Sequence, residues 1–379
     1  MKILQTPVRF PPFAGGVENY VYNLSRELAR LGHEVTVLCA DEPKSEREEI
    51  LDGVRVRRLP YIGKVANTNI TPTLPVEILR EEFDLVHTHL PTPWSADWSA
   101  LAAAVKGRPM VLTHHSDIVG RGRMSYAAKI YNNVNQKIVL NKSSKIIITN
   151  PKVIESSPYL KHYSHKIEII PVGVDIKRFR PIDLPEKEHP VGKKVLFISV
   201  LDRFHRFKGL DRLLMAMVDV VKEVPEAKLV VGGGGELLDR YENMASSLGL
   251  KDRVEFLGRV PEDDIVELYN SCDLFVLPSI SASQETFGMV LLEAMACARP
   301  VVSTEIVGVA EMVKRYGAGL IVESGDEKAL AEAITKLLKN EALRLRMGYV
   351  GRKIAERSYS WNRVALKTQA LYEGLIKGG

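Results

Sequence analysis

The sequence is poor in cysteine and has no long apolar segment. Its three cysteines, Cys39, Cys272 and Cys297, stand in apolar runs without paired spacing. This pattern argues against a disulfide framework or a cysteine-based zinc site, and it predicts buried thiols in a reducing compartment. No run of about 18 uncharged apolar residues occurs, so we expect no membrane-spanning helix. The first residues also lack the apolar core of a secretory leader, and we therefore expect a cytoplasmic protein.

Low-complexity tracts are absent as well. With 45% apolar and 26% charged residues the composition is that of a globular protein, and 379 residues predict two domains rather than one. The net charge of +5 is uneven, because residues 1–180 hold 25 Lys and Arg against 18 Asp and Glu. Such an excess is usually a solvated surface. It also fits a first domain that contacts an anionic membrane peripherally, at the inner membrane face.

Short β-branched runs alternate with amphipathic segments of helical length through most of the chain. This alternation is typical of parallel α/β units. In the first half the expected strands are Lys2–Gln5, Glu34–Leu38, Asp84–His87, Met110–Thr113, Lys145–Thr149 and Glu168–Ile170, and the expected helices are Val17–Leu31, Ala96–Val105 and Ser125–Val139.

The alternation breaks after Gly173 and restarts at Val195. Pro181, Pro185 and Pro190 stand among charged residues between these points, as in an exposed interdomain linker. The expected strands of the second half are Val195–Val200, Lys228–Val231, Arg253–Leu257, Leu274–Leu277 and Pro300–Ser303, with helices at Leu210–Lys222, Leu237–Leu248, Asp263–Tyr269, Gly288–Cys297 and nearly throughout from Glu327. We therefore expect an α/β protein with two doubly wound parallel sheets, in domains 1–178 and 190–360.

One motif of the second half combines two glutamates with a glycine at the expected start of a helix. The segment beginning at Gln284 reads QETFGMVLLEAM and follows an apolar strand. At a helix start, the backbone N–H groups of Phe287, Gly288 and Met289 would form an anion site. Glu293 comes six residues after Phe287, about 9 Å along a helix axis, which is near the span from a diphosphate to the ribose of the same nucleotide.

This motif resembles the signature of retaining glycosyltransferases of family 4, which have the GT-B fold. The resemblance rests on the spacing E-x-F-G-x-x-x-x-E followed by Ala-Met-Ala, and further elements match in order over nearly the whole chain. It implies two Rossmann-like domains that face each other across a cleft, with the C-terminal helix, residues 362–379, crossing back to the N-terminal domain. It also implies that Glu285 stands near the transferred sugar and that Glu293 holds the ribose.

A second element of the resemblance is the basic loop Ser199–Gly209, at the start of the second domain. Arg203 offers a planar guanidinium and Lys208 a mobile ammonium, which suit a diphosphate. In the family an Arg and a Lys five residues apart, the Lys followed by Gly, bind the donor diphosphate. Here Asp202 replaces the glycine that usually precedes the arginine, and Arg206 competes for the same role.

The first half contributes two loops at the expected carboxyl edge of its sheet. The adjacent Gly15 and Gly16 would permit positive φ and a close approach of the donor phosphates, with an ordinary turn as the alternative. The resemblance places His115 close to the transferred sugar, whereas strand alternation turns its neighbour His114 to the opposite face. A structural role is the alternative for the histidine. The remaining acceptor-side candidates are Asp117 and His89.

Two glycine-containing segments of the second half complete the set. Gly258, Arg259 and Val260 resemble the family segment whose backbone contacts the base. The run Gly232–Gly235 does not satisfy the G-x-G-x-x-G spacing, which argues against a nicotinamide cofactor.

The resemblance implies hexosyl transfer from a nucleotide-sugar to a glycan, lipid-linked or small-sugar acceptor, as in polysaccharide biosynthesis, with no nucleic-acid partner. No two aspartates are separated by one residue, so the Asp-x-Asp metal motif of many transferases is missing. We expect Arg203, Lys208 and backbone N–H groups to stabilise the leaving diphosphate without a metal or other cofactor. Two alternatives stay open: a nucleotide-sugar epimerase or hydrolase on the same fold, and a non-catalytic nucleotide-sugar-binding protein.

Overall fold

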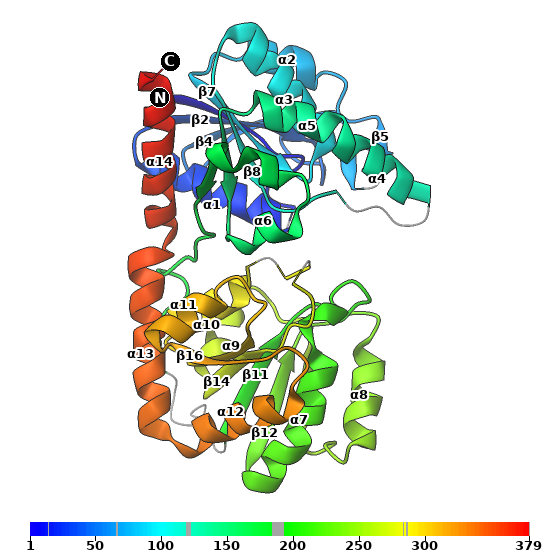
Figure 1. Ribbon diagram of the computed structural model, residues 1–379, viewed down its shortest axis with the longest axis vertical. Coiled ribbons are helices and arrows are strands. Elements are labelled where there is room, and N and C mark those ends of the chain that lie inside the picture. The colour runs from blue at the N-terminus through cyan, green and yellow to red at the C-terminus, as the bar shows by residue number, and fades with distance from the viewer. Residues whose placement is uncertain are drawn as a thin grey trace. The chain divides into compact units, whose positions relative to one another are not determined.

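The computed structural model describes residues 1–378 apart from Ala14, Ala66 and residues 119–122, 184–192, 283 and 286. The chain forms two compact units, Met1–Gly173 with Trp361–Gly379, and Val174–Ser360 (Figure 1). The first unit thus ends before residue 178, because Val174 already pairs with Ser360 and donates its N–H to Tyr359 O at 2.7 Å. Two prolines of the expected linker, at positions 185 and 190, lie outside the described residues.

The first unit is built on an eight-stranded sheet in the order β10-β9-β8-β7-β1-β2-β4-β3. All neighbours are parallel except β3, which runs antiparallel to β4. The inner strands β1, β2, β7 and β8 are almost wholly buried, as expected for a parallel sheet covered on both faces. The strands are β1 Lys2–Thr6, β2 Glu34–Ala40, β3 Glu48–Leu51, β4 Val54–Leu59, β7 Leu85–Leu90, β8 Met110–His114, β9 Lys145–Ile148 and β10 Ile167–Ile169, and a separate hairpin pairs β5 Gly63–Val65 with β6 Thr68–Ile70.

Helices cover this sheet. They are α1 Gly16–Arg30, α2 Leu74–Arg80, α3 Pro93–Lys106, α4 Arg123–Asn133, α5 Asn135–Lys142, α6 Lys152–Ser156, a 3-10 segment Leu160–Lys166 and α14 Trp361–Lys377. The single helix expected at Ser125–Val139 was wrong, because the chain breaks it at Val134 into α4 and α5. The C-terminal helix α14 belongs to the first unit, where Trp361 and Tyr372 are buried.

The second unit holds a six-stranded parallel sheet in the order β13-β12-β11-β14-β15-β16. Its strands are β11 Lys193–Ile198, β12 Ala227–Gly232, β13 Val254–Gly258, β14 Leu274–Leu277, β15 Val301–Thr304 and β16 Gly319–Val322. Its helices are α7 Leu210–Glu223, α8 Leu238–Ser247, α9 Ile265–Asn270, α10 Met289–Ala296, α11 Ala310–Tyr316, α12 Glu327–Lys339 and α13 Glu341–Ser358.

Both sheets are doubly wound, which confirms the predicted fold class. The strand order reverses between β1 and β7 in the first sheet and between β11 and β14 in the second. At such a switch point the loops that follow the two strands diverge and leave room for a ligand beyond their carboxyl ends. We therefore expect ligand-binding residues on the loops that follow these four strands.

The three cysteines are buried free thiols. Burial raises the pKa of each of them to about 12, so they stay protonated and inert near neutral pH. No helix in the described part of the chain combines the length and the apolar character needed to cross a bilayer.

Candidate functional site

The loops after β11 and β14 are packed directly against each other at the switch point of the second sheet. The Ile280 N–H donates to Phe207 O at 2.7 Å. Gly209 has a φ of +78°, and a Cβ there would come within 2.1 Å of the Pro278 carbonyl oxygen. Only glycine combines that backbone conformation with that close approach. The two loops therefore hold their side chains in a fixed relation.

This packing brings together Lys208 and Glu285, which the sequence singled out separately. Lys208 Nζ lies 2.6 Å from Glu285 Oε2, and the Glu285 side chain is only 5% exposed. Ser279, which follows β14, donates its hydroxyl to the same Oε2 at 2.9 Å. The carboxylate is thus compensated by one cation and one hydroxyl donor, as a buried charge requires. Ser279 was not predicted, although its place just beyond a buried strand was a usable signal.

Helix α10 starts beside this cluster at Met289, one residue after the expected start at Gly288. Gly288 precedes it with a φ of +86°, and a Cβ there would come within 2.5 Å of a Val307 methyl group. Leu291 donates its N–H to Gly288 O at 3.0 Å, whereas no hydrogen bond from the N–H groups of Met289 and Val290 is present among the described residues, so these two amides can bind an anion. Phe287 lies outside the helix, and its ring is buried. The distance along the helix axis to Glu293 is therefore measured from Met289, and it is about 6 Å rather than the 9 Å expected.

Glu293 is held by a tyrosine that the sequence analysis did not identify. Tyr269, fully buried at the end of α9, donates its hydroxyl to Glu293 Oε2 at 2.7 Å. Burial raises the pKa of Glu293, and the hydrogen bond from Tyr269 opposes that rise. No hydrogen bond to the other carboxylate oxygen is present among the described residues, so that oxygen is available to a ligand.

Among the described residues, Arg203 pairs with Glu236 and not with Glu285. Its side chain is 75% exposed, and its Nε lies 2.8 Å from Glu236 Oε1. Asp202, which stands where the family usually has glycine, accepts hydrogen bonds from the N–H groups of Phe204 and His205, each at 2.8 Å. The substitution therefore stabilises the turn that carries Arg203. The competing Arg206 is exposed as well.

The glycine run after β12 supports the loop after β11. Gly233 and Gly235 have φ of +135° and +155°, and a Cβ at either position would lie 1.7 Å from Ser199 O or 2.3 Å from Leu201 O. These glycines are thus explained by packing, without a nucleotide.

The segment expected near the base follows β13. Gly258 has a φ of +64° with no atom within 4 Å of a built Cβ, and its carbonyl accepts the Gly233 N–H at 2.7 Å. Arg259 is exposed and Val260 partly exposed. The structure leaves this edge open but does not bring these residues into contact with Lys208 or Glu285.

In the first unit, the Gly15–Gly16 loop follows β1. Neither glycine uses the positive φ that the sequence would permit: Gly15 is extended with φ of −162°, and Gly16 begins α1. A Cβ at Gly15 would lie 2.3 Å from Glu18 Oε2, whereas a Cβ at Gly16 would meet no atom of the described residues within 4 Å. Packing within the chain therefore explains Gly15 but not Gly16.

His115 lies at the end of β8, partly exposed and stacked on His89. The two ring centroids are 5.6 Å apart, and the edge contact with Tyr20 is 5.0 Å. Burial, together with the nearby His114, lowers the pKa of His115 to about 3. Its imidazole is therefore neutral at neutral pH.

His89 lies behind His115 in the core. It is fully buried, with Nε2 3.0 Å from Gln5 Oε1 and Nδ1 3.4 Å from His115 Nε2. The expectation that His89 contacts an acceptor is therefore wrong in this structure, since its ring is enclosed. Next to it, buried His87 lies 2.6 Å from the Tyr372 hydroxyl of α14.

Asp117 is partly exposed and accepts several hydrogen bonds at Oδ1. The donors are Gln136 at 2.8 Å and Ser157 at 3.1 Å, and His114 Nε2 lies 3.0 Å away. Burial alone would raise the pKa of Asp117, but these contacts lower it overall. The His114 side chain thus contacts Asp117, whereas the His115 side chain contacts His89 and Tyr20.

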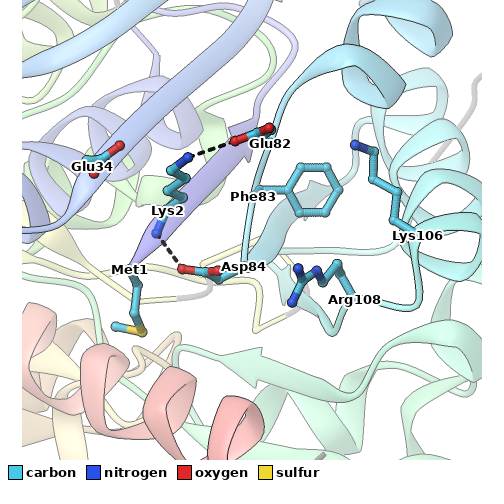
Figure 2. A pocket seen from close by; sticks show the side chains of 8 residues that line it. All are labelled: Met1, Lys2, Glu34, Glu82, Phe83, Asp84, Lys106 and Arg108. Atoms are coloured by element: carbon cyan, nitrogen blue, oxygen red, sulfur yellow. Dashed lines mark hydrogen bonds and ion pairs between the residues drawn. The ribbon is translucent and has the colours of Figure 1, made fainter.

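A separate hollow of about 670 Å³ opens at the amino ends of β1, β2, β7 and β8 (Figure 2). It is lined by Met1, Lys2, Glu34, Glu82, Phe83, Asp84, Lys106 and Arg108. Lys2 satisfies two of the carboxylates, with its Nζ 2.8 Å from Glu82 Oε2 and its N–H donating to Asp84 Oδ2 at 2.7 Å. This hollow contains none of the candidate residues. Within the described ranges, no group of three or more His, Cys, Asp or Glu side chains is arranged to hold a metal ion.

Both units match family models. The model described as Glycosyltransferase Family 4 matches residues 14–178, and the model described as Glycosyl transferases group 1 matches residues 182–354.

Full-length relatives agree with these matches. The chain is 29% identical to the D-inositol 3-phosphate glycosyltransferase of Corynebacterium jeikeium (strain K411), over 97% of this chain and 93% of the relative. It is 28% identical to the phosphatidyl-myo-inositol mannosyltransferase of Mycobacterium leprae (strain TN), over 96% and 94%. Its fold is similar to that of Anabaena Alr3699/HepE in complex with UDP-glucose, with a TM-score of 0.72, 19% identity and coverage of 99% and 100%.

Proposed function

The chain belongs to glycosyltransferase family 4 with the GT-B fold, and from this premise we propose that it is a retaining, metal-independent enzyme that moves a hexosyl group from a nucleotide-sugar to a sugar acceptor. The observation that carries the proposal is the Lys208–Glu285 pair at the switch point of the second sheet, beside the first turn of α10. Donor binding there would put the diphosphate next to a cation and free backbone amides, and the sugar next to a carboxylate.

Departure of the nucleoside diphosphate is the step that these residues would assist. Negative charge grows on the diphosphate as the sugar–phosphate bond breaks, and fixed positive groups stabilise it. Lys208 and the first-turn amides of α10 are preorganised for this purpose. Arg203 could leave Glu236 at little cost, because an exposed ion pair contributes at most about 1 kcal/mol. No metal or other cofactor is needed in this scheme.

Glu285 and Glu293 would have different tasks. Glu285 is held by Lys208 and Ser279, which suits positioning of the sugar and electrostatic support. Glu293 keeps one carboxylate oxygen free for the ribose hydroxyls, while Tyr269 occupies the other. In the first unit, neutral His115 and the open surface at Gly16 remain candidates for contacts with the sugar and the donor phosphates, and Asp117 for the acceptor side.

The compared proteins guide the choice of substrates. The similar Anabaena protein forms a complex with UDP-glucose, which supports a nucleotide-sugar donor. The names of the two relatives include an inositol phosphate and a phosphatidyl-inositol, which favours a small polar alcohol or a lipid-borne acceptor. A cytoplasmic location is part of the same proposal and is supported by the free thiols.

The first test combines donor screening with a transfer assay. Thermal-shift measurements with UDP- and GDP-sugars identify the donor, because a ligand that binds the folded state raises the unfolding temperature. With that donor, we expect Lys208→Ala and Glu293→Gln each to lower kcat/KM by about tenfold or more. Lys222→Ala and Glu332→Gln, on exposed faces of α7 and α12, are the matched controls.

Three outcomes would refute parts of the proposal. Full activity in both site variants would remove the site. Activity that disappears with EDTA and returns with magnesium would refute metal independence. An epimer or free sugar as sole product, over a broad acceptor panel, would favour the epimerase or hydrolase.

A further inference from the structure

The stretch 118–154 of the first unit carries cations without a single carboxylate. It contains no Asp or Glu, and its basic residues are Arg121, Arg123, Lys129, Lys137, Lys142, Lys145 and Lys152. Helices α4 and α5 lie within it. Lys129, Lys137 and Lys142 are exposed, and within the described residues none of these three makes an ion pair. Their charge is therefore available to an external anion.

The same two helices expose a regular apolar stripe. Tyr126, Ile130, Val134 and Ile138 follow each other at every fourth residue, with exposed fractions of 77%, 61%, 53% and 53%. Such spacing normally marks the buried face of a helix, because residues four apart lie on one side. Here it faces outward, so the stripe has no partner within the described part of its unit.

Helix α3 extends this apolar surface. It packs beside α5 (Figure 1), and its side chains Leu101 and Val105 are exposed. A groove of about 360 Å³ runs between α3 and α5, with Leu101, Ile138 and Lys142 among its lining residues. We call these exposed residues of α3, α4 and α5 the α3–α5 face.

We propose that the α3–α5 face binds the surface of an anionic lipid bilayer. The apolar side chains would enter the boundary between headgroups and acyl chains, while the lysines remain at the level of the lipid phosphates. Each lysine near an anionic surface strengthens such binding by about fivefold. The proposed function gains from this placement, because a lipid-borne acceptor would then be met at the membrane. Membrane binding itself does not require that function.

Charge favours a bilayer over the other partners. In a two-fold dimer through this face, the unpaired lysines of one copy would approach those of the other, and like charges repel. An acidic polymer would use the lysines but leave Tyr126 and Ile130 in water. A bilayer, with anionic headgroups above an apolar interior, satisfies both features.

The test is sedimentation of the full chain with vesicles, without donor or acceptor. We expect binding to vesicles of phosphatidylcholine and phosphatidylglycerol in equal parts, weaker binding to phosphatidylcholine alone, and release at high salt. Tyr126→Gln with Ile130→Gln should lower the partition coefficient by about tenfold or more, as should Lys129→Glu with Lys137→Glu.

Two double variants of the second unit are matched controls. Leu345→Gln with Tyr349→Gln changes an aliphatic and an aromatic residue of similar exposure, four apart on α13. Lys328→Glu with Lys336→Glu reverses two lysines eight apart on α12. Both controls should bind vesicles like the original chain, and circular dichroism verifies folding of every variant.

The proposal fails if the chain does not sediment with the anionic vesicles, or if the two double variants of the α3–α5 face bind as well as their controls. It also fails if analytical ultracentrifugation without lipid finds a dimer that Tyr126→Gln with Ile130→Gln converts to a monomer, since the face would then serve self-association. Transfer to a soluble acceptor, measured separately, should be unchanged in both double variants of the α3–α5 face. A chain that binds vesicles but transfers no sugar would refute the proposed function alone.

Discussion

Two carboxylates of the second unit depend on partners distant in sequence. Glu285 meets Lys208 across 77 residues, and Glu293 meets Tyr269 across 24. Lys208 lies in the loop after β11, and Tyr269 lies in the last turn of α9, which precedes β14. Since β11 and β14 flank the switch point, the strand order of the sheet decides both contacts. The partners matter because a buried carboxylate without a donor is costly and tends to take up a proton.

Removal of the Tyr269 hydroxyl tests the second pair. In Tyr269→Phe we expect the affinity for the donor's nucleoside diphosphate to fall by about fivefold to tenfold, since one hydrogen bond to a charged group is lost. The pKa of Glu293 is already raised by burial, and without Tyr269 it should rise further, so the defect should grow as the pH falls. Calorimetry with the ribonucleotide and its 2′-deoxy analogue is the measurement.

The deoxy analogue separates positioning from general damage. If Tyr269 acts through Glu293 on the ribose, the variant and the original chain should bind the analogue with nearly equal affinity. Equal losses for both nucleotides would contradict this role and point to a disturbed fold. Tyr316→Phe, an exposed tyrosine of the same unit, is the control.

Sequence reasoning could select Glu285, Glu293 and Lys208 because a local motif surrounds each of them. It could not select Ser279 or Tyr269, whose functions depend on contacts made only after the sheet forms. His89 shows the converse. Its position at a strand end suggested an accessible residue, but neighbouring side chains, including Gln5 and His115, enclose it.

At the scale of elements, Gly16 is the first helical residue of α1 and has an ordinary φ. Glycine weakens a helix relative to alanine, and in the described part of the chain no atom within 4 Å of a built Cβ requires glycine at this position. Approach of a ligand from outside is one physical reason to retain it. Gly374 in α14 also has open space around a built Cβ and offers a comparison within the same unit.

Alanine at these two glycines should therefore have different effects. Both Gly16→Ala and Gly374→Ala should leave the first unit at least as stable, with a gain of up to about 1 kcal/mol from helix propensity. Gly16→Ala alone should lower transfer by about tenfold, because its methyl group enters the space expected for the donor phosphates. Urea unfolding and kcat/KM measure the two effects, and unchanged activity in Gly16→Ala would remove this loop from the donor site.

The inner elements were predictable and the outer ones less so. A buried strand such as β14, with the sequence LFVL, reads as a continuous apolar run, whereas the edge strand β3 begins with two glutamates and carries no apolar pattern. Strand β16 and helix α11, both short, were not predicted. The break between α4 and α5 was missed because the residues around Val134 contain neither Gly nor Pro.

At the scale of the whole molecule, the two units differ in their titratable cores. The first contains the buried His87 and His89 with the half-buried His115, and the pKa of each is lowered by burial. The second contains Glu293, whose pKa is raised by burial. These shifts have opposite consequences for stability when the pH falls. A histidine with a lowered pKa stays unprotonated in the folded chain while the unfolded chain takes up a proton, so the folded state is destabilised. A carboxyl group with a raised pKa takes up a proton more readily in the folded chain, so the folded state is stabilised.

Mild acid should therefore destabilise the first unit selectively. In the folded chain the pKa of His87 is about 3, against an ordinary value of 6.5. Its contribution to the free energy of unfolding is therefore complete above pH 6.5 and is lost as the pH falls towards 3. The loss is about 1.4 kcal/mol per pH unit below 6.5 for this residue.

All three tryptophans, Trp94, Trp98 and Trp361, lie in the first unit, so their fluorescence reports its unfolding alone. We expect the urea midpoint from fluorescence to fall between pH 7 and pH 5.5. His162→Gln with His165→Gln, at exposed positions, should keep the same slope, and a midpoint that does not move would show that the buried imidazoles are not held neutral.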